Sequence, residues 1–78
     1  MEELFDEHQL QKIQLLYDDK NNTQLYILIV RIVNIRPPII LNIFIKEFDY
    51  NRSFDEFMEE LYTINKIFNR NNVQSSTL

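Results

Sequence analysis

The chain has 78 residues, no cysteine, no glycine and a formal net charge of −4 at pH 7, with twelve acidic against eight basic side chains. This length fits a single domain, and the missing cysteines exclude disulfide bonds and thiolate zinc sites. The missing glycines exclude a glycine-rich phosphate-binding loop, and the acidic balance disfavours binding to nucleic acid.

The first predicted element is a short helix in the acidic N-terminal segment. In residues 10–17, Ile13, Leu15 and Tyr17 occupy alternate positions, which is typical of a strand, and the polar residues after them favour a hairpin turn. The same stretch can also continue a helix from Glu2, because its apolar residues fall on one broad side. We favour the strand and keep a single helix over 2–17 as the alternative.

One continuous apolar block extends from Leu25 to Phe48 and is interrupted by Arg36-Pro37-Pro38. Because the block is rich in Ile and Val, we predict strands over 25–33 and 39–48. The prolines cannot donate ladder hydrogen bonds, so they belong to the connection or to a strand start. Neither half reaches the ~20 residues of a membrane-spanning helix, and we expect no membrane contact.

A second helix is predicted near the C-terminus, where Ser53-Phe54-Asp55-Glu56 has the pattern of a capping box. We expect this helix to end near Arg70. Its apolar stripe consists of Phe54, Phe57, Met58, Leu61, Ile64 and Phe68. The strand residues on which it should pack are Ile27, Ile29, Ile43 and Ile45.

The predicted fold class is therefore α+β. It consists of a three-stranded antiparallel sheet with a short N-terminal helix and a C-terminal amphipathic helix packed on one face. Residues 1–70 are expected to form this single small domain, and residues 71–78 a flexible C-terminal tail.

The sequence shows no catalytic constellation. Ser53 is explained by capping, Ser75 and Ser76 lie in the predicted tail, and nothing near the single histidine, His8, suggests a fixed nucleophile. One histidine without cysteine does not make a zinc site unless carboxylates help. The Asp and Asn residues at 18–22 lack the glycine and terminal glutamate of an EF-hand. We therefore predict no enzymatic activity, no metal and no cofactor.

Acidic side chains gather in two segments and suggest a negative surface for a basic protein partner. The candidate residues are Glu2, Glu3, Asp6, Glu7, Asp55, Glu56, Glu59 and Glu60. The alternative is a solvated surface, because several of these carboxylates suit the positive ends of helix dipoles.

The second face of the predicted sheet is a candidate interface for a homodimer. Its residues are Tyr26, Leu28, Val30, Ile32, Phe44 and Phe48. Leu4 and Phe5 are too few to cover it, and a large exposed apolar patch marks an interface. The alternative is that a helix over 2–17 covers this face.

From these features we expect a non-enzymatic, small acidic protein-binding module that docks on a basic protein. Small acidic α/β proteins occur among phage-encoded inhibitors of bacterial defence, so by fold-level analogy we expect a viral or mobile-element inhibitor. The alternative is a structural subunit that assembles through the apolar sheet face. An acidic N-terminus unlike a signal peptide and the missing cysteines lead us to expect a cytoplasmic location, in the host if the protein is viral.

Overall fold

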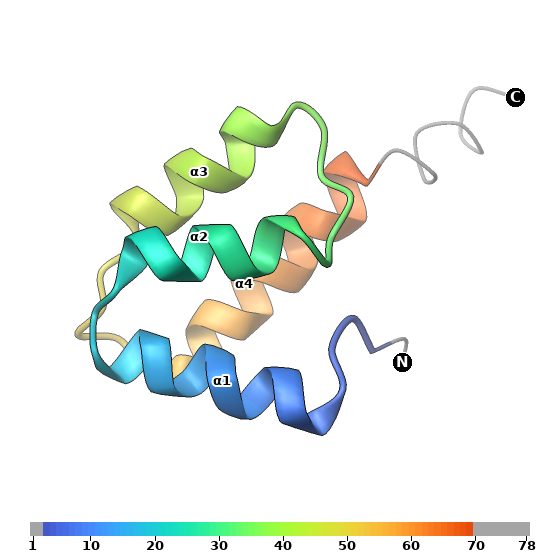
Figure 1. The fold of residues 1–78 in the computed structure, drawn as a ribbon. Helices are drawn as coiled ribbons and strands as arrows, with labels where there is room; N and C mark the ends of the chain where they lie inside the picture. Colours follow the sequence, from blue (N-terminus) through green and yellow to red (C-terminus); the bar gives the residue numbers. More distant parts are fainter. Residues whose placement is uncertain (1–2, 70–78) are drawn as a thin grey trace, which may run out of the picture.

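The computed structural model describes residues 3–69, and over this range the chain forms four helices: α1 (Glu7–Asp18), α2 (Asn22–Val30), α3 (Pro38–Glu47) and α4 (Phe54–Phe68). In Figure 1, α2 lies between α1 and α3, and α4 crosses behind this layer. The described residues contain no sheet; a single isolated bridge joins Ile35 to Asn69. The predicted α+β class is therefore wrong, and the predicted tail at 71–78 lies outside the described residues.

Helix α1 replaces the strand predicted at 10–17. Asp6 accepts a hydrogen bond from the backbone N–H of Gln9 at 2.8 Å, and the Gln9 side chain accepts one from the N–H of Asp6 at 2.9 Å. This reciprocal pair satisfies two N–H groups that a helix start leaves without partners. Ile13 and Tyr17, four positions apart, are buried on one side. The alternative of a longer helix is nearer to the structure, although α1 begins at Glu7.

The turn between α1 and α2 lies where the polar run predicted a turn, but it joins two helices. Lys20 has a φ of 56°, a left-handed conformation that is usual for glycine. Its N–H donates to the carbonyl of Tyr17 at 3.0 Å, and the N–H of Asn21 donates to Leu16 at 2.9 Å. These two bonds close a helix in the Schellman pattern. In a chain without glycine, a lysine adopts the conformation that this ending requires.

Helices α2 and α3 replace the two predicted strands. Asn21 caps α2 by accepting from the N–H of Gln24 at 3.2 Å, and Pro37 and Pro38 lie at the start of α3, where proline suits the first turn. Buried positions recur every four residues, as a helix requires: Leu25 and Ile29 in α2, Leu41 and Ile45 in α3. Burial of one face against the other helices outweighs the strand propensity of the Ile and Val side chains.

The C-terminal helix is confirmed, together with its cap. The Ser53 hydroxyl accepts from the N–H of Glu56 at 3.2 Å, and a Glu56 carboxylate oxygen accepts from the N–H of Ser53 at 3.2 Å. Phe57 and Leu61 of the predicted stripe are fully buried. Helix α4 ends at Phe68, two residues before the predicted end.

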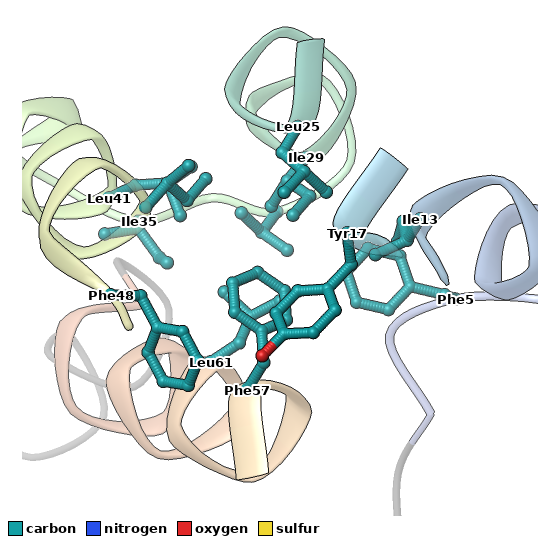
Figure 2. Packing of buried hydrophobic residues seen from close by; sticks show 12 residues of the cluster. Phe5, Ile13, Tyr17, Leu25, Ile29, Ile35, Leu41, Phe48, Phe57 and Leu61 are labelled. Carbon is teal, nitrogen blue, oxygen red and sulfur yellow. The ribbon is translucent and has the colours of Figure 1, made fainter. Parts of the chain in front are cut away.

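One hydrophobic core joins the two layers, and Figure 2 shows side chains from all four helices converging on it. Its buried members are Phe5, Ile13, Tyr17, Leu25, Ile29, Val33, Ile35, Leu41, Ile45, Phe48, Phe57 and Leu61. The Tyr17 ring centroid lies 5.0 Å from that of Phe57, and its hydroxyl donates to the carbonyl of Arg52 at 2.6 Å. Tyr17 thus connects the end of α1 to the start of α4. Within residues 3–69, no helix is long and apolar enough to cross a membrane.

Candidate functional site

A groove runs between the N-terminal segment, α1 and one flank of α4. Its apolar lining consists of Leu4, Leu10, Phe54, Met58 and Tyr62, all half-buried. Its polar lining consists of Gln14, Ser53, Asp55, Glu59, Thr63, Asn65 and Lys66. The groove has a volume of about 1240 Å³ and is open to solvent, whereas small-molecule pockets enclose about 300–1,000 Å³. Its size and openness suit a peptide segment better than a small ligand.

Helices α1 and α4 form the walls of the groove. Their groove residues recur every three or four positions, as their core residues do. Leu10 and Gln14 lie one turn apart on α1, beside the buried Ile13 and Tyr17. On α4, the groove residues Asp55, Met58, Glu59 and Tyr62 lie beside the buried Phe57 and Leu61. The same turns of helix therefore fix the core and orient the groove side chains.

The N-terminal segment is held against α4 by a single aromatic residue. Phe5 is buried, and its ring centroid lies 6.3 Å from that of Tyr62. Its neighbour Leu4 is thereby placed in the groove lining. Because the apolar contact of Phe5 fixes the segment, Leu4 belongs to the groove although no helix contains it.

The predicted acidic residues of α4 divide into two pairs on different flanks. Glu56 and Glu60 each lie within ion-pair distance of Arg52, at 3.4 and 2.8 Å. Hydrogen bonding from the Ser53 backbone N–H, and then Arg52 itself, lower the pKa of Glu56. Asp55 and Glu59 line the groove and make no ion pair with any other described residue. Within residues 3–69, the second pair thus has carboxylates without an ion-pair partner, in a lining that also contains Lys66.

The N-terminal acidic residues have separate roles. Glu3, Asp6 and Glu7 are exposed, and Asp6 is committed to capping α1. Glu7 precedes Leu10 by three positions, which places it on the groove flank of α1. Glu2 lies outside the described residues. The predicted acidic face is therefore not one continuous surface: Asp55 and Glu59 line the groove, whereas Glu7 lies one turn before the lining residue Leu10 and does not itself line it.

The residues predicted as an oligomer interface do not form an exposed face. Phe48 is buried in the core, and the others pack partly against it: Tyr26, Leu28, Val30, Ile32 and Phe44. Alternation along a strand would place these residues on one face, but Tyr26 and Leu28, two positions apart in a helix, point to different sides of α2. Phe44 and Phe48 stay together, with ring centroids 5.5 Å apart. The predicted contacts of α4 also change, because Ile29 and Ile45 are buried but Ile27 and Ile43 are exposed.

Comparison of the chain with models of protein families, with curated proteins and with solved structures finds no match. The functional interpretation therefore depends on the groove and its charges. Sequence analysis identified the acids beside it but missed Leu4, Leu10, Met58 and Tyr62 as a common surface. The sequence signal that could have identified this surface was the side of α4 next to the core stripe, which carries both apolar and polar side chains.

Two tyrosines outside the groove lining, the buried Tyr17 and the half-buried Tyr50, serve the fold. Burial, with a smaller contribution from Tyr17, raises the pKa of Tyr50 to about 12, and its hydroxyl donates to the carbonyl of Ile45. Burial also raises the pKa of Tyr17. Both hydroxyls therefore stay protonated at neutral pH and act as hydrogen-bond donors. Among the described residues, no group of three histidine or carboxylate side chains is placed to hold a metal ion.

Proposed function

We propose that this chain is a non-enzymatic protein-binding module that holds a basic, partly apolar segment of another protein in the groove between α1 and α4. The observation that carries the proposal is the position of Asp55 and Glu59 beside Met58 and Tyr62. These apolar side chains are half-buried, and the two carboxylates make no ion pair with another residue in the range 3–69. Such a surface matches a segment that presents both apolar and cationic side chains.

The expected binding mode is an amphipathic helix laid into an apolar groove. Covering the exposed parts of Leu10, Met58 and Tyr62 is favourable by about 25 cal/mol per Å² of apolar surface. Lysine or arginine side chains of the ligand would meet Asp55 and Glu59 on the α4 wall. These charges speed association and select against acidic ligands.

Two parts of the sequence-based interpretation lose their support. The analogy with small α/β inhibitors depended on a sheet, and self-assembly through a sheet face depended on that same sheet. The binding of a basic protein does not depend on a sheet, because the acids and the apolar flank of α4 are present in the helical fold. We keep the cytoplasm as the proposed location, since a chain without cysteine suits a reducing compartment.

Fluorescence anisotropy with a labelled synthetic peptide tests the proposal. The probe is an amphipathic helix of leucine and lysine, and its binding should weaken as salt is raised. Exposed ion pairs contribute about 0.2–1 kcal/mol each. The double variant Asp55→Asn/Glu59→Gln should therefore bind roughly 2- to 30-fold more weakly.

Matched controls separate the groove from net charge and from general hydrophobicity. Asp18→Asn/Asp19→Asn removes two charges from exposed positions outside the groove and should leave binding nearly unchanged. Met58→Gln should weaken binding, whereas Leu15→Gln changes a side chain that is 69% exposed and lies outside the groove. Equal losses in the two charge variants, or no binding by the wild type, would contradict the proposal.

A further inference from the structure

The outward face of α3 carries an apolar stripe that the core does not use. Ile39 and Ile43 lie one helical turn apart and are 53% and 54% exposed. They point away from the buried Leu41 and Ile45, because 100° per residue places them on the opposite side of the helix. This pair is the longest outward apolar run within a single helix among the described residues.

Cations lie at both ends of this stripe, and one acid, the exposed Glu47, lies four positions after Ile43 on the same side of α3. Arg36 precedes α3, Lys46 lies in its last turn, and both residues are exposed. The sequence from Lys20 to Lys46 contains four basic residues and no acid. The face therefore presents two isoleucines between two positive charges, with Glu47 as a single opposing charge beside Lys46. We refer to Arg36, Ile39, Ile43 and Lys46 as the basic stripe.

The basic stripe has the chemistry that the proposed function assigns to a ligand of the groove. Ile39 and Ile43 would cover the half-buried Leu10, Met58 and Tyr62 of the groove. Lys46 can meet Asp55 or Glu59, which have no ion-pair partner within residues 3–69.

We propose that the groove of one molecule receives the basic stripe of a second copy of this chain. This inference rests on the proposed function and names a partner for the same site. In Figure 1, α1 and α3 lie on opposite sides of α2, so a molecule cannot place its own stripe in its own groove. The two surfaces differ, so the contact is head-to-tail and leaves a stripe and a groove open at the two ends. Assembly then grows with concentration instead of stopping at a two-fold dimer.

Size-exclusion chromatography with light scattering over a range of concentrations tests this contact. The wild type should increase in mass with concentration and decrease in mass with salt. Lys46→Glu and Glu59→Lys, each alone, should weaken association roughly 10-fold or more, because like charges then face each other. Mixing the two variants should restore association. The stripe of Lys46→Glu then meets the groove of Glu59→Lys with both charges reversed, and the other contact keeps the wild-type charges.

Further variants and outcomes make the result decisive. Ile43→Gln should weaken association, whereas Leu15→Gln, outside both surfaces, should not. All of these positions are exposed or half-exposed, and circular dichroism confirms that each variant is folded. A two-fold dimer unaffected by the charge reversals would overturn the inference. A wild type that stays monomeric yet binds the leucine-lysine peptide would overturn self-docking alone; failure of both measurements would overturn the proposed function as well.

Discussion

Replacing Tyr17 by phenylalanine tests how α1 and α4 are held together. The substitution keeps the ring, whose centroid lies 5.0 Å from Phe57 and 5.1 Å from Tyr50. It removes the hydroxyl that donates to the carbonyl of Arg52 at 2.6 Å and lies 3.3 Å from that of Ser53. Both carbonyls belong to the turn that leads into α4, so the change is confined to one connection between the two groove walls.

The expected loss follows from that geometry. A neutral hydrogen bond contributes about 0.5–1.5 kcal/mol, and leaving a buried group without its partner costs about 1–3 kcal/mol. The Arg52 carbonyl is only partly buried, so water can replace some of the lost bond. We therefore expect Tyr17→Phe to lower the free energy of unfolding by about 1–2 kcal/mol, a substantial share of the stability of a small domain.

Urea denaturation followed by circular dichroism measures this loss, and Tyr26→Phe is the matched control. Tyr26 is half-buried, whereas Tyr17 is buried, and no hydrogen bond of the Tyr26 hydroxyl is found with another described residue. The control should therefore stay within about 0.5 kcal/mol of the wild type. A Tyr17→Phe variant as stable as Tyr26→Phe would refute the view that this hydroxyl connects the helices. Peptide affinity should fall along with stability, because α1 and α4 form opposite groove walls.

Three further changes test other parts of the fold. Leu61→Ala, at a fully buried position, should cost about 2–5 kcal/mol in urea denaturation, and an unchanged midpoint would contradict the core packing. Lys20→Gly should raise the free energy of unfolding by about 0.5–1 kcal/mol, since Lys20 has a φ of 56° and glycine reaches that region without a steric penalty; a loss of stability would refute the strain argument. Because the folded pKa of Tyr50 is raised to about 12 from 10.0, its contribution to stability is complete below pH 10.0 and is lost as the pH rises to about 12. Thermal melts of Tyr50→Phe should show a flatter alkaline decline than those of the wild type.

Local signals in the sequence were sufficient for α4 but not for α2 and α3. The cap of α4 depends on Ser53 and Glu56, which lie three positions apart, so the pattern alone identifies it. From Leu25 to Val33 almost every side chain is apolar, and such a run fits a period of two as well as a period of 3.6. Proline at the start of α3 was the available helix signal, because proline suits a first turn.

The groove was only partly predictable for a different reason. The acids of α4 are visible in the sequence, but the sequence does not show that Arg52 engages Glu60 at 2.8 Å while Glu59 faces another flank. The apolar lining joins residues from both ends of the chain, Leu4 with Tyr62, and no local pattern links positions so far apart. Contacts between distant parts of the chain determine which partly apolar side of a helix stays exposed.

The placement of Phe5 against Tyr62 has a consequence for the timing of function. The α1–α2 and α2–α3 pairs join neighbouring segments, whereas the groove requires closure between positions 5 and 62. Such closure carries a larger entropic cost than local pairing and tends to come late in folding. The groove therefore exists only once α4 has joined the fold, because no pair of neighbouring helices contains it. A ligand of the groove would then bind only the completed fold, because this closure brings the two walls of the groove together.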